Sequence, residues 1–150
     1  MIQLTPEHQQ AIIAYAESTY PEECCGIMLG YLVGSDKTVV TVIATENAWN
    51  EQENNRSSRY AVAPSAMLQA QKAARDQSID IIGIYHSHPD HPARPSECDH
   101  VSAWQIYSYA IVSVEQGKAG EMKSWCLDDD HEFQPEEIQI KSVSLHTIIR

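Results

Sequence analysis

The chain has 150 residues, and its 21 Asp and Glu against 10 Lys and Arg give a formal net charge of −11. This length fits one domain and excludes a TIM barrel, which needs about 250 residues. The acidic balance argues against nucleic acid and against an anionic membrane surface as partners, because both require a basic face on the protein.

The N-terminal part of the chain predicts a helix followed by a hairpin. Thr5-Pro6-Glu7 combines a capping hydroxyl, a proline and an acid, which is typical of a helix start, and Pro21 ends that helix. The apolar segment Cys24–Val33 predicts a buried strand. Lys37–Ala44 is rich in β-branched residues and predicts the second strand of the hairpin, after a Gly-Ser-Asp turn.

The middle of the chain predicts a loop, a helix and a strand. Asn47–Arg59 is polar, so we expect a loop there, and a substrate-gating loop is slightly favoured over a plain connection. Pro64–Gln77 places Met, Leu and Ala residues on one helical face. Ile79–Tyr85 is apolar and predicts a central strand, which two histidines and a proline-rich loop follow.

The last part predicts a short helix near Ser96 and two strands, Ser108–Val114 and Glu121–Leu127, separated by two glycines. The segment from Pro135 onward alternates weakly, which leaves an edge strand and a docking arm open as alternatives. Strands and helices mix without strict β-α-β alternation. We therefore expect an α/β or α+β domain with a mixed central sheet flanked by helices.

No segment predicts export or membrane insertion. The N-terminus lacks the cationic region and apolar core of a signal peptide, and the apolar stretches fall short of the roughly 20 residues of a spanning helix. We therefore expect a cytoplasmic protein. The four cysteines fit reduced, small apolar side chains better than a disulfide framework or a Cys-x-x-Cys site; they are Cys24, Cys25, Cys98 and Cys126.

Two histidines follow the predicted central strand at alternate positions. Residues i and i+2 of a strand project to the same face, so His86 and His88 can point into one site. Imidazole nitrogens are good zinc ligands, with bonds of roughly 2.0–2.1 Å. For an isolated His-x-His pair, however, two ordinary polar residues at the end of a strand are the commoner explanation.

A stiff loop connects this pair to a carboxylate. Pro89, Pro92 and Pro95 each restrict the backbone, so the ends of the loop are held in a fixed relation. Ser96 and Asp99 have the spacing of a helix start, which is the simpler interpretation, but a carboxylate in the first turn can also face a metal. Two imidazoles and one carboxylate leave a fourth tetrahedral position for water, as in catalytic zinc sites.

A hydrolytic zinc site also needs a general base near the water. Glu22 and Glu23 precede the predicted buried strand and are candidates for this base. Their spacing does not show which of the two acts, and both could also be ordinary solvated acids. The sequence lacks other zinc-hydrolase signatures, among them His-Glu-x-x-His and the pattern of the nucleobase deaminases.

The complete pattern resembles the signature of the JAMM (MPN-plus) metalloprotease family, and its short bacterial branch in particular. His-x-His, seven residues and Ser-x-x-Asp match that signature, and Glu23-Cys-Cys-Gly26 is similar to the family's Glu-x-x-Gly strand. The resemblance implies a single MPN/JAMM-like domain over residues 1–134 with a cytidine deaminase-like architecture. It leaves residues 135–150 as a tail of unknown role, which we expect to pack on the same domain.

The resemblance also implies a set of site residues. His86, His88 and Asp99 would hold one Zn²⁺ per chain. Glu23 would take a proton from the zinc-bound water and deliver it to the leaving amine, and Ser96 would help to bind the developing oxyanion. A His/His/Asp site also accepts other divalent metals, so zinc itself is an expectation.

The substrate implied by the resemblance is the amide bond after the C-terminal Gly of a ubiquitin-like protein. In the bacterial branch this would be a sulfur-carrier protein with a Gly-Gly tail, for example in an adduct with cysteine that serves cysteine biosynthesis. A Gly-Gly tail suits a narrow cleft, because glycine lets the backbone approach closely. Two alternatives stay open: a peptidase for another ubiquitin-like conjugate or peptide, and a non-catalytic binding module, which the retained ligands disfavour. The oligomeric state also stays open.

Overall fold

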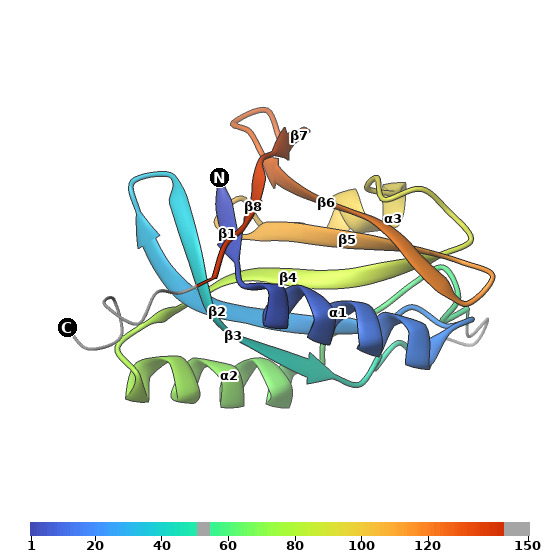
Figure 1. The fold of residues 1–150 in the computed structure, drawn as a ribbon, viewed down its shortest axis with the longest axis horizontal. Coiled ribbons are helices and arrows are strands. Elements are labelled where there is room, and N and C mark those ends of the chain that lie inside the picture. Colours follow the sequence, from blue (N-terminus) through green and yellow to red (C-terminus); the bar gives the residue numbers. More distant parts are fainter. Residues whose placement is uncertain (51–54, 143–150) are drawn as a thin grey trace.

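A computed structural model describes residues 1–50 and 55–142. In these ranges the chain forms one mixed sheet with helices on both faces (Figure 1). The helices are α1 (Pro6–Thr19), α2 (Pro64–Asp76) and α3 (Glu97–Ser102). The strands are β1 (Ile2–Leu4), β2 (Cys25–Val33), β3 (Asp36–Thr45), β4 (Asp80–Pro89), β5 (Ser108–Glu115), β6 (Lys118–Leu127), β7 (Phe133–Glu136) and β8 (Ile138–Ile140).

The strands follow the order β7-β6-β5-β4-β2-β3-β1-β8 across the sheet. β1 runs parallel to β3 and β8, and β4 runs parallel to β5, whereas the other neighbours are antiparallel. The expected fold class, a mixed sheet flanked by helices, is confirmed. In the described part of the chain, every helix is too short or too polar to cross a membrane.

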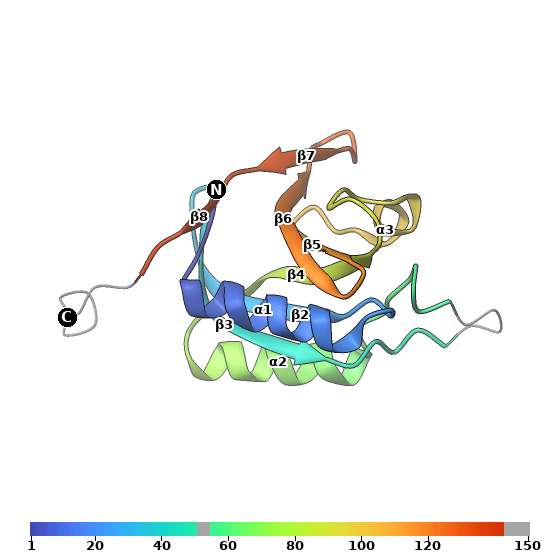
Figure 2. The ribbon, with the colours of Figure 1, turned by 45° about the vertical axis from the view of Figure 1, so that its right-hand side comes forward.

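Alternation along the central strands builds one core on each face of the sheet. On β2, Met28 joins the core beneath α1, whereas Ile27 joins the core beneath α2. The helices contribute Ile12 from α1 and Ala70 and Ala74 from α2. Figure 2 shows the two helices on opposite faces of the sheet. Because both faces are covered, the central strands are apolar almost throughout.

The two long helices are confirmed, and the first begins where the sequence predicts. Thr5 caps α1: its side-chain oxygen accepts the backbone N–H of His8 at 3.1 Å, and Nδ1 of His8 accepts the N–H of Thr5 at 3.2 Å. This reciprocal capping box satisfies two N–H groups that would otherwise lack partners. α2 begins at Pro64, and its end at Asp76 lies one residue before the predicted one.

β4 is longer than the sequence predicts. The expected strand ends at Tyr85, but the observed one continues through both histidines to Pro89. The reason is pairing on its far side: β5 continues the parallel register, so that His86 pairs with Ile111 and His88 with Ser113. The two histidines are therefore strand residues in a buried sheet.

β6 also starts earlier than expected, at Lys118. The predicted break between the strands included Gly120, but the turn is tighter and consists of Gln116 and Gly117. Both have positive φ, 49° and 84°, which matches a two-residue hairpin turn whose twist suits the flanking strands. Glu115 pairs directly with Lys118 across this turn.

Residues 133–140, which include the first part of the segment after Pro135, form strands at both edges of the sheet. β7 pairs antiparallel with β6, and β8 pairs parallel with β1. The short β1 is an element that the sequence pattern does not predict. Residues 133–140 therefore run from one edge of the curved sheet to the other. Residues 143–150 lie outside the described part, so the packing of these last residues of the tail on the domain stays a prediction.

Candidate metal centre and active site

Three segments that are distant in sequence meet at one end of the central strands. Glu23 lies two residues before β2, His86 and His88 lie in β4, and Asp99 lies in α3. All four side chains are buried. β2 and β4 pair antiparallel with Cys25 opposite His86. Continuing this register by two residues sets Glu23 opposite His88, which explains why these two residues meet.

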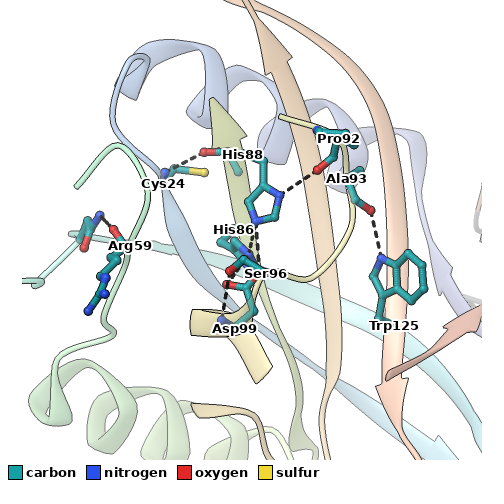
Figure 3. Close-up of polar contacts among 11 residues, drawn as sticks. Cys24, Arg59, His86, His88, Pro92, Ala93, Ser96, Asp99 and Trp125 are labelled. Carbon is teal, nitrogen blue, oxygen red and sulfur yellow. Dashed lines mark hydrogen bonds and ion pairs between the residues drawn. The ribbon is translucent and has the colours of Figure 1, made fainter. Parts of the chain in front are cut away.

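The metal-ligand candidates lie at nearly equal distances from one another (Figure 3). Nε2 of His86 is 3.2 Å from Nε2 of His88 and 3.2 Å from Oδ1 of Asp99. Nε2 of His88 is 3.1 Å from Oδ2 of Asp99. Ligands of a tetrahedral zinc ion with bonds of 2.0–2.1 Å would be about 3.3 Å apart. A carboxylate oxygen of Glu23 and a ring nitrogen of each histidine also lie within 4.8 Å of one another.

The contact of His88 with Pro92 decides which of its ring nitrogens faces the carboxylate of Asp99. Nδ1 of His88 lies 2.8 Å from the carbonyl oxygen of Pro92, so Nδ1 carries a proton and donates it there. In the neutral ring, Nε2 then directs a lone pair at the carboxylate of Asp99, 3.1 Å away. These two electron-rich atoms repel unless a proton or a metal ion lies between them. A backbone carbonyl that accepts the other ring N–H is also the usual outer contact of a metal-binding histidine.

Burial and charge set different ionisation states within the cluster. Burial, followed by the negative charge of Asp99, raises the pKa of Glu23 to about 9. Burial lowers the pKa of His86 against the opposing charge of Asp99, so its ring is neutral, the form that binds metals. Burial opposes ionisation of Asp99, but contacts with His86 and with the backbone N–H of Ser96 hold the pKa of Asp99 well below its usual range.

Two buried polar atoms of the cluster lack hydrogen-bond partners among the described residues. They are Oε1 of Glu23 and Nδ1 of His86. Leaving such an atom buried and unpaired costs about 1–3 kcal/mol, so it is tolerated chiefly where a ligand, ion or reacting group completes the site. Together with the lone pair of His88 and the ligand spacing, these atoms fit a divalent metal with nitrogen and oxygen ligands.

The helix-start and metal-ligand interpretations of Ser96 and Asp99 prove compatible. Oγ of Ser96 accepts the backbone N–H of Asp99 at 3.2 Å, and Oδ2 of Asp99 accepts the N–H of Ser96 at 2.8 Å. The same Oδ2 faces His88. The capping box of α3 therefore orients the carboxylate toward the histidines, and the Ser96 hydroxyl proton stays free to donate elsewhere.

Sequence reasoning missed two residues that support the histidines. The ring of Tyr60 stacks on His86 with centroids 4.4 Å apart, and no spacing pattern pointed to it. Ser87 is fully buried, and its Oγ accepts the backbone N–H of Cys24 at 2.8 Å, which ties β4 to the residue after Glu23. Strand alternation offered a signal here, because the residue between two histidines must point to the opposite face.

The polar segment after β3 holds Glu23 in place. The backbone N–H of Glu23 donates to the carbonyl of Arg56 at 2.7 Å, and Nδ2 of Asn47 donates to the carbonyl of Glu23 at 3.1 Å. The guanidinium of Arg59 lies 5.1 Å from the ring centre of Trp49. Residues 51–54 lie outside the described part, and the substrate-gating role expected for this loop stays a prediction.

Two hollows adjoin the cluster. The larger has a volume of about 600 Å³ and contains Asp99 in its wall; we call it the apolar hollow because most of its lining is aromatic or aliphatic, with Trp49, Tyr60, Trp104 and Tyr109. The smaller has a volume of about 430 Å³, and we call it the polar hollow. It is lined by Glu23, Ser58, His88, His91, Pro92, Arg94, Pro95 and Ser96.

A mixed sheet thus carries a buried cluster of histidines and carboxylates at the end of its central strands, where a divalent metal could be held. A family model described as prokaryotic homologs of the JAB domain matches residues 5–128. The chain therefore belongs to this family, and it is a hydrolase of the JAMM type. The resemblance to the JAMM family is thereby confirmed.

Individual relatives agree with this assignment. A desampylase from Pyrococcus furiosus is 26% identical over 141 residues, which cover 92% of this chain and 90% of the relative. A probable TtuB-protein conjugate cleaving protease from Thermus thermophilus is 42% identical over 61 residues, 40% of each chain. The solution structure of a protein from Desulfitobacterium hafniense matches with a TM-score of 0.83 and 32% identity over 97% of both chains.

Proposed function

We propose that this chain is a zinc metallopeptidase that cleaves the amide bond after the C-terminal Gly of a ubiquitin-like protein, and that this protein is a sulfur carrier with a Gly-Gly tail. The names of the desampylase and of the TtuB-conjugate protease support cleavage of ubiquitin-like conjugates. The observation that carries the proposal is the lone pair of His88 directed at Asp99, beside the unpaired carboxylate of Glu23.

In this proposal His86, His88 and Asp99 hold the zinc. When bound, zinc would supply a Lewis acid that acidifies water and polarises the scissile carbonyl. The chain prepares the ligands in advance: the Pro92 carbonyl orients His88, and the capping box of α3 orients Asp99. A site organised in this way loses little free energy to rearrangement when the reaction begins.

Glu23 is the proposed general base and acid. Its raised pKa of about 9 reflects burial and the nearby Asp99 charge, and positive charge bound nearby favours the ionised form that accepts a proton. Oε1 of Glu23 then takes a proton from the attacking water and returns it to the leaving amine. The Ser96 hydroxyl, which lines the same hollow, donates to the developing oxyanion.

The experiment combines metal analysis with a cleavage assay. The chain is purified, loaded with zinc, quantified by elemental analysis, and given a Gly-Gly-tailed carrier extended by one residue. We expect cleavage after the second Gly, detected by mass spectrometry, and its loss on chelation. Glu23→Gln should keep the zinc but lower kcat by about 10²–10⁴-fold, the usual contribution of a general base.

Glu22→Gln is the matched control. Glu22 is exposed whereas Glu23 is buried, so the control should retain activity. A dead Glu22→Gln beside an active Glu23→Gln would refute the assignment of the base. A chain that binds no zinc when supplied with it would favour the non-catalytic binding module. Cleavage of lysine-linked conjugates but not of carrier tails would favour the alternative substrate.

A further inference from the structure

The two hollows beside the cluster differ in the groups they offer to a substrate. Glu23 and His88 line the polar hollow, whereas Asp99 lines the apolar hollow. Under the proposed mechanism Glu23 delivers the proton to the leaving amine, so that amine must be in reach of Glu23 when the bond breaks. The polar hollow is therefore the leaving-group side, and the carrier tail approaches from the apolar hollow.

The polar hollow contains one permanently charged cation, Arg94. Its guanidinium is always protonated, and it has no ion-pair partner among residues 1–50 and 55–142. Its presence there contrasts with the net charge of −11 of the whole chain. The hollow has a volume of about 430 Å³, near the lower end of ligand pockets, which hold about 300–1,000 Å³. It fits a single residue with an anionic group.

The backbone around Arg94 is held firmly. Three successive carbonyls of the preceding loop accept hydrogen bonds from side chains of the sheet: His91 from Ser113 at 2.7 Å, Pro92 from His88 at 2.8 Å and Ala93 from Trp125 at 3.1 Å. Figure 3 shows the last two of these contacts. These contacts attach the loop to β4, β5 and β6. They therefore fix the position of the Arg94 backbone relative to Glu23 and the histidines.

The chemistry of the leaving group decides what such a cation recognises. A free α-amino acid leaves with its carboxylate one carbon away from the new amine, so a group near the amine also meets the carboxylate. A lysine that leaves an isopeptide bond carries no free carboxylate near its ε-amine. An arginine beside the proton donor therefore selects the first type of leaving group through a charge-assisted, bidentate contact.

We propose that the polar hollow is a binding site for the α-carboxylate of a single leaving amino acid, and that Arg94 determines this specificity. The inference rests on the proposed peptidase function and adds to it a specificity-determining residue, which selects carriers joined to the amino group of a free amino acid over carriers joined to lysine. In the reaction, water adds its oxygen to the glycine carbonyl carbon and the carbon–nitrogen bond breaks. The carrier leaves with a carboxylate, and the amino acid leaves with its amine protonated.

The test uses two peptides that differ in one group. Both are N-acetylated and end in Gly-Gly-Ala, one with a free carboxylate and one with a carboxamide. We expect the zinc-loaded enzyme to cleave the free acid with a kcat/KM about tenfold or more above that of the carboxamide, the factor of one charge-assisted hydrogen bond. In Arg94→Gln this ratio should fall to near one, with Arg94→Lys intermediate. Arg75→Gln, on α2, should keep the wild-type ratio.

A binding measurement separates this inference from the proposed function. The zinc-loaded Glu23→Gln chain is titrated with both peptides by calorimetry, with and without Arg94→Gln. Tighter binding of the free acid that is lost in Arg94→Gln supports the inference even if neither short peptide is cleaved, whereas failure to cleave the extended Gly-Gly-tailed carrier would refute the peptidase proposal alone. Equal binding and equal cleavage of the two peptides, or a ratio unchanged in Arg94→Gln, would overturn the role of Arg94.

Discussion

Glu22 and Glu23 are adjacent and chemically identical, yet they lie in different environments. Glu22 is exposed to solvent, whereas Glu23 is 4% exposed, and burial together with Asp99 raises the pKa of Glu23 to about 9. A buried carboxyl with so high a pKa holds its proton at physiological pH and can deliver it as an acid, and positive charge bound nearby would favour the ionised form that acts as a base. At this scale, burial distinguishes the two residues.

Burial also predicts which cysteines react. Burial raises the pKa of Cys24 to about 12 and the pKa of Cys25 to about 11, so at pH 8 their reactive thiolates make up less than about 0.1% of the population. Cys98 is exposed. We expect iodoacetamide at pH 8 to label Cys98 and to spare Cys24 and Cys25, as measured by peptide mapping.

Raising the pH to 9 should leave Cys24 and Cys25 unlabelled, because raised pKa values keep both thiols protonated until the pH approaches 11. Labelling in urea is the control, since unfolding exposes all the thiols and should remove the difference. Labelling of Cys24 and Cys25 at the rate of Cys98 in the folded protein would contradict the expected environment.

At the scale of elements, the pairing of β2 with β4 sets the site. Gly26 lies opposite Tyr85, and the same register brings Glu23 to the histidines. The Tyr85 ring is buried and crosses over Gly26, so a Cβ at that position would lie 2.1–2.3 Å from three atoms of the ring. Close packing of the ring on the backbone explains why a glycine stands three residues after Glu23.

We expect Gly26→Ala to lower the free energy of unfolding by about 1–3 kcal/mol or more, because a buried clash forces the ring or strand to move. Urea denaturation measures the change. Gly120→Ala is the matched control: Gly120 also lies in a strand, but a Cβ there meets no atom within 4 Å, so its effect should stay within about 0.5 kcal/mol. Equal losses in the two variants would argue against the packing of Tyr85.

At the scale of the whole molecule, residues 133–140 complete the sheet at both edges. β7 covers the edge of β6, and β8 covers the edge of β1. Glu136 adds a side-chain contact, since it accepts the hydroxyl hydrogen of Ser124 at 2.7 Å. Long unpaired strand edges are templates for aggregation, and the short β7 and β8 take their place as the edges of the sheet, so this segment protects the sheet as well as stabilising it.

A chain that ends at Asp130 should therefore be less stable, by at least about 3 kcal/mol, and prone to self-association, because both edge pairings are lost. Urea denaturation and size-exclusion chromatography measure the two effects. A chain that ends at residue 142 is the control, since it keeps every strand pair described above. If both truncated chains behaved alike, the edge strands would contribute little.

Elements that depend on neighbouring residues in the sequence were predicted better than elements that depend on pairing with distant strands. Helices α1 and α2 and the β2–β3 hairpin carry local signals, namely caps, periodicity and turn residues, and they were predicted nearly to the residue. β1, β7 and β8 have three to four residues each and form only because an edge strand is available to pair with. The continuation of β4 through His86 and His88 likewise depends on β5, which follows about twenty residues later.

Local patterns in the chain were sufficient to predict the class of fold and to group His86, His88, Ser96 and Asp99, because these signals lie within short stretches of sequence. Long-range packing sets which of two adjacent glutamates faces the histidines, which nitrogen of His88 faces the Pro92 carbonyl, and that Arg94 lines the same hollow as Glu23. These properties depend on burial and on contacts between strands that are distant in the chain, and no local pattern encodes them.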